Sequence, residues 1–177
     1  MELTVTSGPL PAGRYTRSGF KPPITIELDG PWRAVQLLSG LFDVQRDVGS
    51  PDVIAVQFAR PDGVYGPEGQ LVETDGAAAA ADALAANAAL ITVERSGSRM
   101  GGLDGFQITV ENGGAGDAAV LHLPPGALSI APERRLWVAF FDTSAGLLAI
   151  MVGGSVARWD EALAAAEPVL ESVTIGP

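Results

Sequence analysis

The sequence predicts an α+β fold in which a mostly antiparallel sheet of six or more strands carries two main helices. Short stretches of alternating apolar and polar residues recur along the chain, as they do in half-buried strands. An alanine-rich stretch and a later stretch with apolar residues every three or four positions predict the helices. With 177 residues, of which 47% are hydrophobic, the chain suits one domain.

The first nine residues carry no core signal, so we expect a flexible lead-in (1–9) before a single domain at 10–177. Ile24–Leu28 alternates apolar and polar residues most regularly, which is typical of a strand with one buried face. Other short strands are expected at 14–17, 42–46 and 53–58. The next stretch, 61–76, is rich in glycine and proline and predicts a loop.

The middle of the chain predicts one helix and three strands. Ala77–Leu90 is alanine-rich and lacks glycine and proline, which favours a helix, and Asp75 is a suitable N-cap. Strands are expected at 91–94, 106–111 and 118–123. The glycine- and serine-rich residues after position 94 predict a turn, and Gly113–Asp117 predicts the tip of a hairpin.

The last third contains the clearest core signal. Leu136–Phe141 and Leu147–Val152 are apolar at nearly every position, so we expect both strands to be buried on two faces in the middle of the sheet. The four residues between them suit a hairpin. Apolar residues then recur at steps of three and four from Val156 to Val173, which predicts an amphipathic helix that Pro168 kinks or interrupts.

Charge and composition exclude several classes of function. The formal net charge of −10 opposes binding to nucleic acid or to another polyanion. The absence of cysteine excludes disulfides, thiolate nucleophiles and cysteine-based zinc sites. No apolar run approaches the ~20 residues that span a bilayer, so no transmembrane segment is expected. The N-terminus lacks the basic and apolar regions of a signal peptide, so export requires a signal that is not in this sequence.

No stretch of the sequence has the residue pattern of a catalytic or metal site. The single histidine, His122, has no visible partner set, and we interpret it as an ordinary strand residue. Ser155 lacks the glycine spacing of a nucleophile elbow and is read as a helix start. Gly113–Asp117 is one residue short of a calcium-binding repeat. We therefore expect no cofactor, no metal and no enzymatic activity.

One local concentration of positive charge stands out in this acidic chain. It consists of basic and aromatic residues that alternate near the N-terminus, namely Arg14, Tyr15, Arg17, Phe20 and Lys21. A basic and aromatic edge suits an anionic ligand or a partner protein. The simpler interpretation is a solvated edge strand whose charges block aggregation. The three tryptophans are expected to pack in the core rather than line a pocket.

Three stretches resemble a known group. Leu10–Trp32, with a Pro-Ala-Gly-x-Tyr turn, a Phe-x-Pro and a strand leading to Gly-x-Trp, is similar to the opening of uncharacterised bacterial extracytoplasmic domains. Arg134–Ile175, with Val169–Val173 at the end of its helix, resembles the hairpin-plus-helix ending of the PsbP-like α/β/α sandwich and the LpqN-type lipoproteins. Gly101–Phe106 also suits this group. The resemblance implies that fold and an exported or lipid-anchored setting, with no catalytic residues.

These observations favour a non-enzymatic, extracytoplasmic binding or protein-interaction module whose partner is an unknown protein or small molecule. The alternatives are a cytosolic scaffold or assembly factor and, from a different class, a hydrolase that uses His122.

Overall fold

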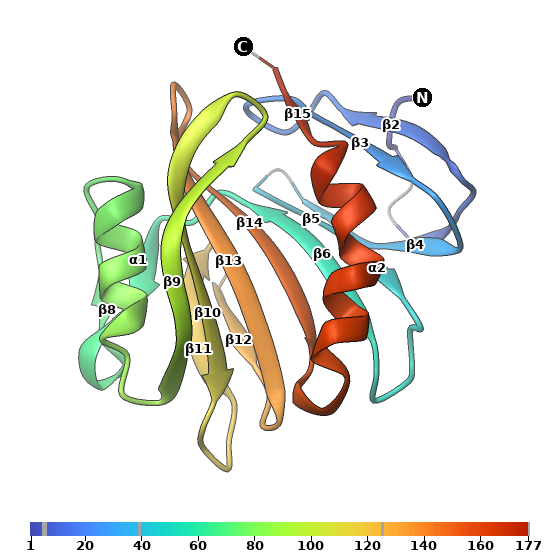
Figure 1. Cartoon of the computed structure of the whole chain (residues 1–177). Helices are drawn as coiled ribbons and strands as arrows, with labels where there is room; N and C mark the ends of the chain where they lie inside the picture. The colour runs from blue at the N-terminus through green and yellow to red at the C-terminus, as the bar shows by residue number, and fades with distance from the viewer. Residues whose placement is uncertain (5–6, 39, 125, 177) are drawn as a thin grey trace.

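The computed structural model describes residues 1–4, 7–38, 40–124 and 126–176, and it confirms the α+β prediction. Its centre is an eight-stranded antiparallel sheet with the strand order β1-β4-β5-β6-β14-β13-β10-β9 (Figure 1). The strands of this main sheet are β1 (Gly8–Leu10), β4 (Trp32–Leu38), β5 (Leu41–Arg46), β6 (Ile54–Ala59), β9 (Leu90–Met100), β10 (Leu103–Asn112), β13 (Arg134–Thr143) and β14 (Gly146–Ser155).

Two smaller antiparallel sheets and two helices cover the main sheet. One small sheet has the order β12-β11-β7-β8, and the other has the order β15-β3-β2. Their strands are β12 (Gly126–Ile130), β11 (Ala118–Leu123), β7 (Gly63–Tyr65), β8 (Leu71–Val72), β15 (Thr174–Ile175), β3 (Ile24–Leu28) and β2 (Gly13–Arg17). The helices are α1 (Ala77–Ala85) and α2 (Trp159–Glu171), with 3₁₀ turns η1 (Pro67–Gly69) and η2 (Val156–Arg158).

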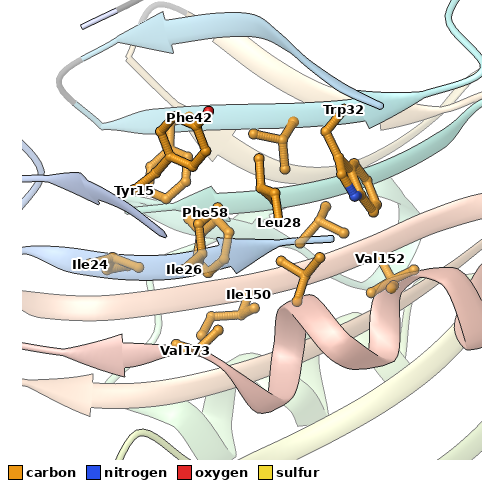
Figure 2. Close-up of a cluster of buried hydrophobic side chains, with 14 of the residues drawn as sticks. Tyr15, Ile24, Ile26, Leu28, Trp32, Phe42, Phe58, Ile150, Val152 and Val173 are labelled. Carbon is orange, nitrogen blue, oxygen red and sulfur yellow. The ribbon is translucent and has the colours of Figure 1, made fainter. Parts of the chain in front are cut away.

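The main sheet separates two hydrophobic cores. On one face, α2 and the β2–β3–β15 sheet enclose a core that contains Trp32, Phe42 and Phe58, shown in Figure 2. The rings of Phe42 and Phe58 stack with centroids 4.4 Å apart, an arrangement that adds to the energy of apolar burial. On the other face, helix α1 and the small-sheet strands β7 and β11 enclose a second core around Leu84 and Leu121.

The β13–β14 hairpin lies at the centre of the sheet, as the sequence predicts. Ala139 and Phe141 face the core under α2, whereas Val138 and Phe140 face the core under α1. Successive residues of a strand point to opposite faces, so a strand between two cores must be apolar throughout. Thr143 pairs with Gly146, which confirms the predicted hairpin between these strands.

The first helix is shorter than its sequence predicts, and its N-cap is different. The helix ends at Ala85 rather than Leu90, and the backbone N–H of Ala77 donates to the Asp142 carboxylate of β13 (2.9 Å). Asp142 therefore replaces the predicted cap, Asp75. Gly76 adopts φ 99°, and a Cβ atom there would lie 3.2 Å from the same carboxylate, so only glycine fits this cap well.

Beyond α1, the chain also departs from the prediction. The buried amide of Asn87 donates to the carbonyls of Tyr65 (2.9 Å) and Ala119 (3.1 Å), which turns the chain out of the helix. Strand β9 then continues through the residues predicted to be a turn, and the reversal falls at Gly101 and Gly102, both with positive φ. The predicted loop at 61–76 contains β7, η1 and β8.

Two other segments differ in their connections. Residues 113–117 join the main sheet to the β12–β11–β7–β8 sheet and do not close a hairpin. The second helix begins at Trp159, after the η2 turn, and contains Pro168. Trp32 and Trp159 are buried and Trp137 is half-buried against the same core, as expected for core tryptophans.

Both ends of the chain attach to the β2–β3–β15 sheet. In the segment where the sequence shows no core signal, Leu3 is fully buried and its N–H donates to the carbonyl of Thr16 (2.7 Å). At the other end, the N–H of Gly176 donates to the carbonyl of Pro23 (2.7 Å). The two termini consequently lie at the same end of the molecule (Figure 1). Of the described residues, neither helix has the length and apolar character needed to cross a membrane.

The cap of α1 gives a direct test of the fold. Asp142→Ala is expected to lower the unfolding free energy by about 0.5–2 kcal/mol, because it leaves a helix N–H without its acceptor. Denaturant unfolding measures this loss. Asp75→Ala is the matched control and should change stability by less than about 0.5 kcal/mol. Equal losses in the two variants would contradict the tertiary cap.

Candidate binding cleft

A cleft of about 920 Å³ lies at the end of the main sheet where β10 ends and β13 begins. Four loop segments line it, at 51–52, 111–115, 132–134 and 155–157. The molecule also has hollows of about 560, 330 and 190 Å³, so this cleft is the roomiest of the four. Its volume is within the range of small-molecule and peptide sites.

An arginine and an aspartate brace one wall of the cleft. Arg134, at the start of β13, donates to the carbonyls of Pro51 (2.9 Å) and Val53 (2.7 Å). Burial lowers the pKa of Arg134, and the nearby Asp52 carboxylate opposes this shift. Asp52 in turn accepts hydrogen bonds from the Ser155 hydroxyl (3.1 Å) and the Arg158 guanidinium (3.2 Å). These contacts tie the β5–β6 loop to the η2 turn.

An asparagine braces the opposite wall. The Asn112 side-chain amide donates to the carbonyls of Gly116 and Ile130, at 2.8 Å each. Its Oδ1 accepts the N–H of Gly114 (2.8 Å), which makes an Asx turn. The connection at 113–117 is therefore held against the end of β12 by a buried side chain.

A glutamate that lines the cleft, Glu111, is also engaged. Glu111 forms an ion pair with Arg135, whose guanidinium lies over the Trp159 ring, 5.5 Å from its centroid. Within the described ranges, no group of three or more histidine, aspartate or glutamate side chains is arranged to hold a metal ion. Ser155 donates its hydroxyl to Asp52 and has no histidine beside it. The arrangement is a braced cleft that can bind, without a free acid–base pair.

His122 lies away from this cleft, on β11. Its Nδ1 atom is 3.9 Å from Asp62 Oδ2, too far for a hydrogen bond, and it is buried without a hydrogen-bond partner among the described residues. The Tyr65 ring is 6.5 Å away. Asp62 lines the hollow of about 330 Å³, together with Arg60, whose guanidinium donates to the carbonyl of Ala145. The structure thus gives His122 an acidic neighbour that the sequence did not reveal.

The five basic and aromatic residues near the N-terminus do not form one surface. Tyr15 is buried and its hydroxyl donates to the Pro11 carbonyl (2.8 Å). Phe20 is buried with its ring perpendicular to that of Phe42. Arg17 donates to the carbonyl of Leu3 (3.1 Å). Arg14 and Lys21 are exposed, and Arg14 lies 3.8 Å from Glu27. Burial removes both aromatic rings from the face on which a ligand was expected.

A buried carboxylate that no sequence pattern marks lies on β5. Asp43 is 3% exposed, and its Oδ2 accepts hydrogen bonds from the Gln45 and Gln57 amides, both at 2.9 Å. Its Oδ1 has no partner among the described residues. Burial raises the pKa of Asp43, and the two glutamine hydrogen bonds offset part of this rise. In a strand of alternating apolar and polar residues, a polar residue is expected to face solvent, so the sequence does not predict that Asp43 is buried.

Comparison with solved structures confirms the PsbP-like fold. The chain is similar to the solution structure of the cyanobacterial PsbP protein CyanoP from Synechocystis sp. PCC 6803, with a TM-score of 0.50 and 12% identity over 98% of this chain and 95% of that one. It is also similar to LpqN, involved in cell envelope biogenesis of Mycobacterium tuberculosis, with a TM-score of 0.46 and 10% identity over 97% of this chain and 91% of that one. No protein-family model matches the chain, and no curated protein matches it in sequence.

Asp43→Asn is expected to remove a pH-dependent loss of stability. The pKa of Asp43 in the folded chain is raised above its unfolded value of about 3.9, so the unfolded chain releases this proton first as the pH rises. The wild-type unfolding free energy therefore falls as the pH rises from about 4 through the folded pKa. Relative to wild type, the variant should gain about 1.4 kcal/mol for each unit of pKa shift.

Denaturant unfolding at pH 4 and pH 7 measures this gain. Asp117→Asn, at an exposed loop residue, is the control for removing one negative charge. If the stability difference between Asp43→Asn and wild type is the same at both pH values, the carboxylate is not destabilised by burial.

Proposed function

We propose that this protein is a non-enzymatic binding module that works outside the cytoplasm, and that the cleft at the end of β10, β13 and β14 holds its ligand. One observation carries the proposal. Most hydrogen bonds of the polar side chains in the cleft go to the walls of the cleft itself. The side chains concerned are chiefly those of Arg134, Asp52 and Asn112. A cleft that is held open in this way loses little conformational entropy when a ligand enters.

The lining suggests the class of ligand. Prolines, alanines and glycines supply much of the surface, and the bracing leaves few charged groups free to face a ligand. Such a surface offers apolar contact and backbone hydrogen-bonding groups, which suits a short protein segment or a small, mostly uncharged molecule. The extracytoplasmic setting is supported by the resemblance of Leu10–Trp32 and Arg134–Ile175 to exported domains.

Filling the cleft tests the binding site. A set of small-molecule fragments and short peptides is screened by amide chemical-shift changes, and the shifts should gather at 111–115, 132–134 and 155–157. Ala157→Trp places a large ring in the cleft from an exposed position and should weaken each such interaction at least tenfold. Ala78→Trp, on the exposed side of α1, is the matched control and should leave binding unchanged. Shifts that gather elsewhere would contradict the site.

A second candidate function rests on the proximity of His122 to Asp62. A histidine beside a carboxylate is the usual pair in general acid–base catalysis, and the hollow next to it has space for a substrate. The same samples distinguish the two functions. His122→Ala should leave cleft binding intact, whereas a hydrolytic activity that this variant abolishes would favour the enzyme.

The setting is tested by cell fractionation. The native protein is expected in the extracytoplasmic or membrane-associated fraction, with an N-terminus produced by processing or lipidation, as intact mass would show. A cytosolic protein that begins at Met1 would contradict the proposed setting and favour the intracellular scaffold.

A further inference from the structure

The last strand of the main sheet has a long open edge. Strand β9 spans eleven residues and, among the described strands, pairs with β10 alone. All its side chains are exposed or half-buried. An open edge of this length is a template for another strand, and proteins usually guard it with charged side chains, proline or a covering element. Strand β9 contains no proline, its charged residues are Glu94, Arg95 and Arg99, and Figure 1 shows it at the outer margin of the sheet.

Both arginines of β9 are engaged within their own chain. Arg95 forms an ion pair with Asp82 of α1, and Arg99 lies 3.6 Å from Asp104 of β10. Between these arginines lie small residues, 96–98, that leave the backbone accessible. Gly97 pairs with Phe106, a residue that remains 40% exposed. The middle of the edge is therefore uncharged and bordered by an aromatic ring.

We propose that β9 pairs antiparallel with β9 of a second copy of this chain, about a two-fold axis at Ser96, so that one sheet runs through both copies. This is an interaction additional to the cleft. Its geometry follows from the symmetry of the pairing and from the charges along the strand.

Symmetry leaves few registers. When two identical strands pair antiparallel at their edges, the two-fold axis that relates them is normal to the sheet, so each face of one sheet continues into the same face of the other. Because residues directly opposite each other must point to the same face, one residue of the strand lies opposite its own copy at the axis. Axes at Glu94 or Arg95 place like charges directly opposite each other. An axis at Gly97 places Arg95 opposite Arg99 twice. An axis at Ser98 shortens the paired segment, because the strand ends at Met100. Among these axes, Ser96 gives the longest overlap, out to Val93 opposite Arg99, without placing like charges directly opposite each other.

The pairs formed about Ser96 are compatible on both faces. Glu94 lies opposite Ser98 of the second copy on one face. On the other face, Arg95 of the second copy lies opposite Gly97, next to the exposed Phe106. Because Gly97 has no side chain, it leaves room for Arg95 of the second copy, whose guanidinium pairs with Asp82 of its own chain. The register shift at Val93 ends the regular pairing at one side.

The hydrogen-bonding edge of β9 is open. Helix α2 packs on β14, β6 and β3, away from β9. Helix α1 packs mainly on β10, β13 and β7, and it contacts β9 on one face, where Arg95 pairs with Asp82. In the part of the chain that the structure describes, no strand pairs with the outer edge of β9. The net charge of −10 on each copy opposes association, so dimerisation should strengthen as salt screens this repulsion.

Charge substitutions at the axis test the proposal. The full chain is studied by analytical ultracentrifugation at 0.15 M and 0.5 M salt. Wild type should dimerise reversibly, more strongly at the higher salt. Ser96→Lys and Ser96→Glu should each weaken self-association at least tenfold, because the new charge meets its own copy across the axis. An equimolar mixture of these two variants should recover the dimer, since opposite charges then face each other.

Two further variants check the register and the surface. Ser98→Lys should strengthen the dimer several-fold by facing Glu94 of the second copy. Ser144→Lys and Ser144→Glu, in the exposed β13–β14 turn, are matched controls that should not change association. Circular dichroism checks that each variant is folded. A wild type that stays monomeric at about 1 mM, a dimer that ignores Ser96→Lys, or a mixture that does not recover would each overturn the proposal.

Discussion

The β13–β14 hairpin is the constraint on which the rest of the structure depends. Its strands are apolar on both faces, so the sheet must be covered twice, and the chain divides its remaining elements between the two sides. The order of the sheet follows from this hairpin. Strands β13 and β14 pair with each other at the centre, β10 pairs with the other edge of β13, and β6 pairs with the other edge of β14. Each cover closes one core, and neither core is complete without the hairpin.

The two covers are joined to this centre by polar contacts as well as by packing. Asp142, at the end of β13, fixes the first turn of α1, while Arg134, at its start, fixes the β5–β6 loop. Both contacts link residues more than 60 positions apart in sequence. The same strand therefore sets the position of a helix at one end and of a cleft wall at the other, which makes the cleft a consequence of the central hairpin.

Sequence patterns predicted the elements that are governed by local rules. The alternation of Ile24–Leu28, the apolar runs of β13 and β14 and the periodicity of α2 all report burial that a strand or helix imposes on its own residues. The cap of α1 depends on Asp142, which is distant in sequence, the burial of Leu3 depends on its contact with β2, and the course of β9 past Ser96 depends on its pairing with β10. The cleft could not be predicted from the sequence for the same reason. Asp52, Asn112 and Arg134 are ordinary loop and strand-end residues until folding brings them to one place.

The attachment of both chain ends to the β2–β3–β15 sheet has a consequence for presentation. The termini lie at one pole of the molecule, and the loops that line the cleft lie at the other (Figure 1). Any tether joined to either terminus, whether a linker to a surface or a fused protein, leaves the cleft pointing outward. The orientation of the cleft is thus independent of which end is anchored.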